Sequence, residues 1–331
     1  MPELQLLIFI VIILALIFDF INGFHDTANA IATSVSTRAL QPNHAIMLAA
    51  TLNFIGAMVS TGVAKTIGAG IVSSPSLIDE KTIIAALIGA ITWNLLTWWI
   101  GLPSSSSHAL IGGLIGAVLI SAGLEGLNWQ GIATIFVALV ASPAIAFLTG
   151  IVIMNIIFRA FEKFSPHFLN DKFRRMQILS ASAIAFSNGS NDAQKSMGII
   201  TLALFSGGFI AEFEVPTFVK VLCAASMALG TATGGWRIIK TVGGKIFKLE
   251  PPSGFAADLN SSCVVFGATL LNLPVSTTHV VSGSIMGVGT AKRVNAVRWG
   301  TAQQMVKAWG ITIPITAAIG ALTFGLVEAI L

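Results

Sequence analysis

Charged side chains are scarce in this sequence, and their scarcity excludes most classes of protein. Only 10% of the 331 residues are Asp, Glu, Lys or Arg, whereas 55% are hydrophobic; a soluble domain carries about a quarter charged residues. Apolar runs of about 18 residues or more, long enough to cross a bilayer, recur along the chain. The sequence therefore argues against a cytosolic enzyme, a disordered chain and a disulfide-rich secreted module. It predicts an all-α polytopic membrane protein.

Other absences narrow the class further. The apolar runs do not alternate every second residue, which argues against an outer-membrane barrel. Cys223 and Cys263 both lie in apolar stretches, so we expect two buried small side chains and no disulfide. The first residues carry Glu3 and no basic segment, so we expect the first helix to be retained rather than removed as a signal.

Three motifs occur twice, in the same order and at nearly constant spacing, and they indicate two homologous halves. Residues 20–26 align with residues 186–192, the Lys-Thr-Ile-Gly at 65–68 aligns with the Lys-Thr-Val-Gly at 240–243, and residues 102–116 align with 273–287. We therefore predict an N-terminal transmembrane repeat at residues 1–158, a cytoplasmic linker at 159–177 and a C-terminal transmembrane repeat at 178–331.

Each half contains an apolar stretch that is interrupted by a polar tip. In the first half the stretch at 83–100 is followed by a tip at 103–108 and a second arm at 109–122. At about 1.5 Å per residue, that second arm is too short to cross a hydrocarbon core of about 30 Å. The second half repeats the pattern, with arms at 255–271 and 280–291. We predict two re-entrant helical hairpins whose tips lie inside the membrane.

The distribution of basic residues predicts the orientation. Three crossings and a hairpin in each half would invert the second half relative to the first. Most basic residues fall on one side, among them Arg38, the segment 159–175 and Lys292, whereas Glu125 and Glu212 lie in loops on the other. The positive-inside rule makes the basic side cytoplasmic. We therefore expect an inverted repeat in the inner (plasma) membrane, with both termini outside, and no nucleic-acid partner.

The repeated Asn-Gly-x-x-Asp sets lie in the middle of the two longest apolar stretches, where we expect these helices to break. Asn22 and Asp26 form the first set, and Asn188 and Asp192 the second. Residues four apart share a helical face, and the adjacent glycine would let the backbone unwind and expose carbonyls. Carboxylate, amide and carbonyl oxygens suit a hard cation such as Na⁺. The alternative is that these side chains hold helices together by hydrogen bonds.

The two hairpin tips place hydroxyls in front of a helix start, where free N–H groups and the helix dipole attract anions. Two such tips would meet near the midplane, where transporter sites form; simple helix capping is the alternative. Gln194 adds a donor and an acceptor nearby, and Lys195, whose counterpart is Asn29, could pair with Asp192 or meet an anion. The predicted anion ligands are Ser105, Ser106, Ser107, Ser276, Thr277 and Thr278.

Four further polar residues allow two interpretations each. His108 and His279 could bind a metal or relay protons, but a His just inside a helix start more often orients a loop, and we expect that role. Asp19 and Asp258 are intramembrane acids without partners in the repeat. Asp19 could carry protons, but we expect a buried and paired structural role.

The motifs resemble those of the inorganic phosphate transporter (PiT) family. Residues 23–33 and 191–198 look like its paired signatures, and residues 103–108 and 274–279 look like its two hairpin tips. The resemblance covers nearly the whole chain. It implies a secondary transporter with an inverted repeat that moves inorganic phosphate with a driving cation, Na⁺ or H⁺, commonly as a homodimer.

The resemblance also implies roles for the motif residues. It suggests that Asp26 and Asp192 bind the coupling cations with Asn22 and Asn188 beside them, and that the tip hydroxyls bind phosphate. The family often has a His where this chain has Asn188. An amide cannot titrate, so this departure favours a sodium/phosphate symporter of the bacterial type.

Alternating access driven by a Na⁺ gradient is therefore the function that we expect, with no other cofactor. The alternatives are a proton-coupled phosphate permease, a sulfate permease of the same family and a passive anion channel. An intramembrane hydrolase would need its nucleophile once, whereas every polar set here occurs twice, so we expect no enzyme.

Overall fold

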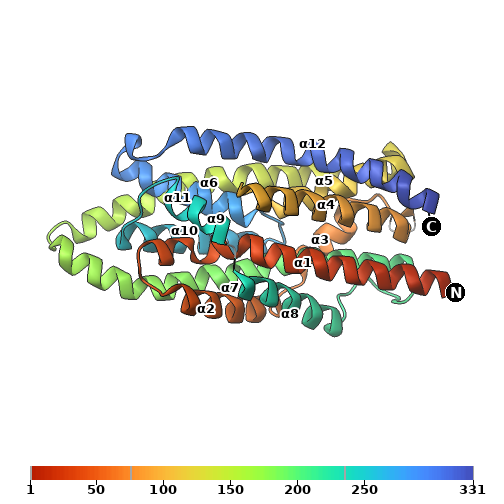
Figure 1. The fold of residues 1–331 in the computed structure, drawn as a ribbon, viewed down its shortest axis with the longest axis horizontal. Coiled ribbons are helices and arrows are strands. Elements are labelled where there is room, and N and C mark those ends of the chain that lie inside the picture. The colour runs from red at the N-terminus through yellow and green to blue at the C-terminus, as the bar shows by residue number, and fades with distance from the viewer. Residues whose placement is uncertain (1, 75–76, 235, 331) are drawn as a thin grey trace.

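The computed structural model describes residues 2–74, 77–234 and 236–330, and nearly all of them are helical. The long helices run along the longest axis of the molecule, and both termini lie at the same end of it (Figure 1). The turn between α6 (Trp129–Phe161) and α7 (Pro166–Ser206) lies at the opposite end. The all-α, multi-pass class that the composition predicts is confirmed.

The same order of elements occurs twice along the chain. Before α6, the first half contains α1 (Pro2–Ser36), α2 (Pro42–Ala57), α3 (Gly62–Gly70), α4 (Glu80–Ile100), α5 (Ser106–Ser121) and the short 3₁₀ helix η2 (Leu124–Gly126). In the second half α7 is followed by the corresponding elements α8 (Thr217–Thr233), α9 (Trp236–Gly244), α10 (Pro251–Leu270), α11 (Thr277–Lys292), the 3₁₀ helix η3 (Val294–Ala296) and α12 (Trp299–Ile330).

Close contacts between the halves mirror each other. Gly230 of α8 lies so close to the carbonyl of Phe20 on α1 that no Cβ would fit between them. Its counterpart Gly56 of α2 meets the carbonyl of Phe186 on α7 in the same way. The α1–α8 and α2–α7 contacts are therefore equivalent, as expected for two homologous halves that pack against each other.

The breaks expected in the two longest helices are wrong, because α1 and α7 stay helical through both Asn-Gly pairs. Gly23 and Gly189 serve close packing instead. A Cβ on Gly23 would overlap the backbone oxygen of Met227, and one on Gly189 would overlap that of Asn53. The breaks fall in the next element of each half: α2 and α3 are bent by 70°, and α8 ends at Gly234, whose φ is 74°.

Both predicted hairpins are present. The first consists of α4 and α5, and the second of α10 and α11. The second arms, α5 and α11, have 16 residues each, which at about 1.5 Å per residue is shorter than the hydrocarbon core. Each second arm packs against the last helix of the other half, α5 on α12 and α11 on α6. The hairpins therefore also tie the two halves together.

Helix α7 is the most polar long helix, and its C-terminal part is enclosed by the others. Among the described residues, α1, α4, α6 and α12 are long and apolar enough to cross a membrane, with the bent pair α2–α3 as a fifth candidate. In α7 every residue from Ser187 to Leu204 is buried. A helix with no lipid-facing side can carry polar groups that an outer helix cannot.

The predicted linker at 159–177 consists mostly of helix rather than loop. Only residues 162–165 separate α6 from α7. Ser165 caps α7 by accepting a hydrogen bond from the Phe168 N–H at 3.4 Å, and Pro166 begins the helix. Phe173 and Gln177 are buried. The basic segment is therefore the solvent-exposed end of two long helices.

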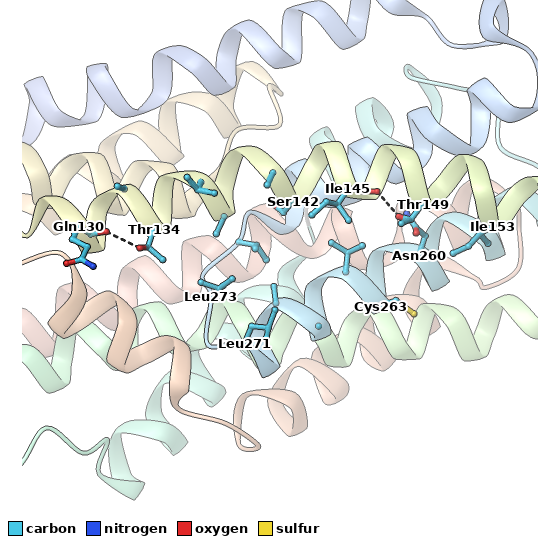
Figure 2. A pocket seen from close by; sticks show the side chains of 18 residues that line it. Gln130, Thr134, Ser142, Ile145, Thr149, Ile153, Asn260, Cys263, Leu271 and Leu273 are labelled. Carbon is cyan, nitrogen blue, oxygen red and sulfur yellow. Dashed lines mark hydrogen bonds between the residues drawn. The ribbon is translucent and has the colours of Figure 1, made fainter.

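A groove of about 840 Å³ lies between α6 and α10 (Figure 2). Cys263 lines it and is exposed, so the expected burial of this cysteine is wrong, whereas Cys223 is buried. Leu273 places the second hairpin tip at the groove. Most of the side chains that line the groove are apolar, and none of the predicted anion ligands is among them, so the predicted anion site does not lie in this groove.

The glycine contacts give a first prediction, on stability. Gly230→Ala would place a methyl group on the Phe20 carbonyl, and overpacking of this kind costs about 1–3 kcal/mol. Gly310→Ala, in open space on α12, removes a helix-destabilising glycine and gains up to about 1 kcal/mol. We expect the first variant alone to unfold at a lower temperature in detergent. Equal midpoints for the two variants would contradict the packing role of Gly230.

Candidate functional site

Helices α5 and α11 both begin inside the protein, at the two hairpin tips. Ser105 caps α5 by accepting a hydrogen bond from the His108 N–H at 3.1 Å, and Ser276 caps α11 through the His279 N–H at 3.3 Å. The capping interpretation therefore holds for these two serines. All hydroxyls of both tips are buried. Each helix start directs its remaining N–H groups and its positive dipole end into the protein interior.

Both hairpin tips reach one carboxylate, that of Asp26 on α1. Its Oδ1 accepts hydrogen bonds from Thr278 Oγ1 and Asn29 Nδ2, each at 2.9 Å. Its Oδ2 accepts one from Ser106 Oγ at 3.2 Å. Ser106 belongs to the first hairpin and Thr278 to the second, so the two halves of the molecule meet at this side chain.

The equivalent acid on α7, Asp192, has a fixed cation. Its Oδ1 accepts a hydrogen bond from Lys195 Nζ at 2.5 Å, and its Oδ2 accepts one from Thr277 Oγ1 at 3.0 Å. Neither charged side chain has any exposed surface. Of the two roles considered for Lys195, pairing with Asp192 is the one seen. The first half has no such pair, because Asn29 occupies the corresponding position.

The two histidines join the tips to each other and to α12. The rings of His108 and His279 lie 4.5 Å apart between centroids, and His279 stacks on Trp309 at 3.9 Å. Nδ1 of His108 lies 2.8 Å from Ser105 Oγ, and Trp309 Nε1 donates to the Pro103 carbonyl at 3.4 Å. These contacts match the expected role of orienting the loops.

Two asparagines that the sequence does not single out as ligands hold the second tip. Asn29 Nδ2 donates to Thr278 Oγ1 at 2.9 Å. Asn191 Nδ2 donates to the Leu273 carbonyl at 3.2 Å, and its Oδ1 accepts from the Val275 N–H at 3.3 Å. The sequence could have indicated this role, because Asn29 and Asn191 both lie inside the signature segments that occur in the two halves. Ser107 Oγ of the first tip also donates to the second, to the Val275 carbonyl at 2.9 Å.

The amides of Asn22 and Asn188 are buried and make no hydrogen bond within the described part of the chain. Leaving a buried polar group unsatisfied costs about 1–3 kcal/mol, so two such groups at matched positions require an explanation. An amide oxygen next to a carboxylate is a suitable ligand for a hard cation. The residues present therefore fit the predicted Na⁺ sites.

Gln194 is not brought to the cluster. Its Nε2 donates to the Ser190 carbonyl at 2.5 Å, and its Oε1 accepts from the Ala64 N–H at 3.2 Å. Both ends of the amide thus tie α7 to itself and to α3. Its role as an anion ligand stays a prediction, which would require Nε2 to leave the Ser190 carbonyl.

The two acids without repeat partners differ. Asp258 is paired: it accepts hydrogen bonds from Thr33 at 2.5 Å, Gln177 at 3.4 Å and Ser180 at 3.5 Å. Asp19 is buried as expected; its carboxyl oxygens make no hydrogen bond of ordinary geometry among the described residues, although the side chains of Ser196 and Cys223 lie beside it.

Fold and site together define a class of protein. Short helices that begin at a shared polar site in the middle of a membrane bundle, in two homologous halves, are typical of secondary transporters. Paired acids and hydroxyls at these helix starts suit an anion and its coupling cations.

Comparison with known proteins shows the family. The profile described as phosphate transporter family matches residues 22–320, and the chain belongs to this family. It is 52% identical to a probable low-affinity inorganic phosphate transporter of Bacillus subtilis over 100% of both chains. It is 49% identical to one of Rhizobium meliloti over 95% of this chain and 94% of the other.

A solved structure has the same fold. The structure titled "The sodium-dependent phosphate transporter" superposes with a TM-score of 0.91 at 28% identity, covering 98% of this chain and 100% of the other. The family and these relatives are transporters rather than enzymes.

The buried ion pair gives a second prediction. Lys195→Met leaves the Asp192 carboxylate buried without its cation. Breaking a buried ion pair in this way lowers the free energy of unfolding by about 3–5 kcal/mol. We expect a lower unfolding midpoint in detergent, and substantial recovery in the double variant Asp192→Asn/Lys195→Met, in which neither charge is left unpaired. A double variant as unstable as the sum of both single variants would contradict the pairing.

Proposed function

We propose that the protein imports inorganic phosphate across the inner (plasma) membrane by alternating access, driven by a cation gradient, with Na⁺ favoured over H⁺. The convergence of both hairpin tips on Asp26 is the observation that carries the proposal. The names of the relatives support phosphate as the substrate. The sodium-dependent neighbour supports Na⁺.

The phosphate site is formed by the two helix starts. Backbone N–H groups and the tip hydroxyls donate to the anion without a fixed basic group that would retain it. In the conformation described, Ser106, Thr277 and Thr278 donate to the acids Asp26 and Asp192 instead. Phosphate takes over these donors when it binds. Ser105, Ser107 and Ser276 complete the set of hydroxyls.

The cations offset the repulsion between phosphate and the two acids. Na⁺ is bound by the carboxylates of Asp26 and Asp192 together with the unsatisfied amide oxygens of Asn22 and Asn188. Lys195 is hydrogen-bonded to Asp192, whereas the contacts of Asp26 among the described residues are His25 Nδ1 at 3.4 Å and neutral donors. Phosphate binding should therefore depend most strongly on the cation at Asp26.

The two halves supply alternating access by symmetry. We infer an inverted repeat of residues 1–158 and 178–331, joined by the basic segment 159–177 on the cytoplasmic side. The mirrored glycine contacts support the repeat. The position of both termini at one end and of the α6–α7 turn at the other supports termini outside (Figure 1). A homodimer in the lipid bilayer is part of the same proposal.

The third prediction tests the coupling. In proteoliposomes, an inward Na⁺ gradient at equal pH is expected to drive phosphate above its equilibrium level. A sodium ionophore should abolish this accumulation, which a passive channel could not produce. If a proton gradient alone drives accumulation, the coupling ion is H⁺ rather than Na⁺. If equimolar sulfate displaces labelled phosphate, the protein is a sulfate permease.

The fourth prediction tests the site. Losing a hydrogen bond to a charged group costs about 1.5–3 kcal/mol, or roughly tenfold or more in affinity. Ser106→Ala and Thr278→Val should therefore weaken phosphate binding at least tenfold and Na⁺ binding much less, as measured by calorimetry. Asp26→Asn should abolish uptake in protein that remains folded.

The matched control is Thr92→Val, because Thr92 is exposed on α4 and bonds only its own helix, at the Ile88 carbonyl. It should behave as the wild type. Unchanged phosphate affinity in both tip variants would refute the assignment of the tips.

A further inference from the structure

The carboxyl group of Asp19 is a buried acid for which the transport site has no use. It lies on α1, about two helical turns before Asp26, and has no exposed surface. Both of its oxygens lack a hydrogen-bond partner within the described residues. The side chains of Ser196 on α7 and Cys223 on α8 lie beside it, and Ser196 Oγ is likewise unsatisfied. We call these three residues the Asp19 pocket.

The second half of the protein has nothing like this pocket. In the register set by the pairs Gly23/Gly189 and Gly56/Gly230, the three pocket residues correspond to three alanines. These alanines are buried in one apolar cluster; they are Ala185, Ala30 and Ala49. The position can therefore be packed with small apolar side chains alone, so an acid there is not needed for the fold.

An ionised carboxylate in this position would be very unfavourable. Moving an unpaired charge from water into a medium of low dielectric constant costs tens of kcal/mol in the idealised case, and such a group is neutralised instead. Two kinds of cation are available for this, a metal ion or a proton. The choice between them depends on the ligands that the pocket offers.

The pocket suits a proton better than a metal ion. Hard cations such as Ca²⁺ and Mg²⁺ take six or more oxygen ligands, and Na⁺ likewise needs several. Ser196 Oγ is the one hydroxyl oxygen beside the carboxyl, and the sulfur of Cys223 is a poor ligand for such an ion. The backbone of α1 is helical throughout, so its carbonyls are already engaged. A proton requires no further ligand.

The charged and titratable groups around the pocket come from several elements. Lys195 and Asp192 of α7 act on the Asp19 carboxyl through space, and Cys223 of α8 lies against it. More distant groups on helices that pack against α1 include His44 of α2, Glu80 and Lys81 at the start of α4, Lys220 of α8, Asp258 of α10 and His279 of α11, with His25 and Asp26 on α1 itself. Lys195, the cation that acts on the Asp19 carboxyl, is itself bound to Asp192.

We propose that Asp19 is a proton-binding site present only in the first half, and that it carries a proton in the conformation described. Loss of this proton would add a negative charge near the phosphate site and weaken anion binding. This consequence rests on the proposed function, whereas protonation itself does not.

Infrared spectroscopy of the purified full-length protein at pH 7, without phosphate, tests protonation directly. Protonated carboxylic acids absorb apart from carboxylates, and their band shifts in D₂O. We expect Asp19→Asn to lose one protonated-acid band. The matched control is Asp258→Asn, which removes a buried carboxyl that accepts three hydrogen bonds and should retain that band. Loss of a carboxylate band instead of an acid band in Asp19→Asn would overturn the proposal, whether or not the protein transports phosphate.

Two further variants cover the case that Asp19→Asn does not fold. Ser196→Ala and Cys223→Ala keep the acid and convert its neighbours to the alanines of the other half. The acid band should persist in both and shift in frequency, and its absence or an unshifted position would overturn the proposal.

The effect of the Asp19 proton on phosphate binding is measured as the ratio of the phosphate affinities of Asp19→Asn and the wild type. The ionisation of phosphate itself affects both proteins equally and cancels in this ratio. The phosphate affinity of Asp19→Asn relative to the wild type should rise with pH, by at most about tenfold per pH unit for one proton. With the infrared result positive, a flat ratio would show that the proton is bound but does not affect the anion site. It would overturn the second half of the proposal alone.

Discussion

The structure depends on one constraint: two helices begin at residues that are buried inside the helical bundle. Backbone N–H groups at a helix start require partners, and hydrocarbon supplies none. Ser105 and Ser276 cap α5 and α11, and the next hydroxyls reach Asp26 and Asp192. The polar groups that make short helices tolerable in a membrane therefore also form the site. Because the two helices come from different halves, any change in how the halves pack alters the site.

A symmetric frame holds an asymmetric set of charges. The frame is set by small residues, since Gly56 and Gly230 let equivalent helices approach equivalent carbonyls. Within it, Lys195 faces Asp192 while Asn29 faces Asp26, and Asp19 and Asp258 have no counterparts. In the proposed transport cycle, symmetry would allow the two halves to exchange conformations with similar packing. Asymmetry would allow the two proposed cation sites to differ in affinity.

The sequence predicts the fold well where length and repetition decide the outcome. The second hairpin arms are too short to cross the membrane wherever they pack, and paired motifs in one order admit few explanations. Prediction from the sequence fails where one residue type can serve two structural purposes. Gly23 and Gly189 look like helix breakers, yet they permit close packing. Gln194 looks like an anion ligand, yet in this conformation its Nε2 donates to the Ser190 carbonyl. Such choices depend on what lies across the interface, which local sequence does not contain.

The central claim is that phosphate and its coupling cation bind together where the hairpin tips meet. Calorimetric titration of the purified protein with phosphate, in sodium chloride and in an equimolar chloride salt of a bulky organic cation, tests it most directly. We expect strong binding in Na⁺, at least tenfold weaker binding without it, and a much smaller Na⁺ effect in Asp26→Asn. Equal phosphate affinity in the two salts would contradict it.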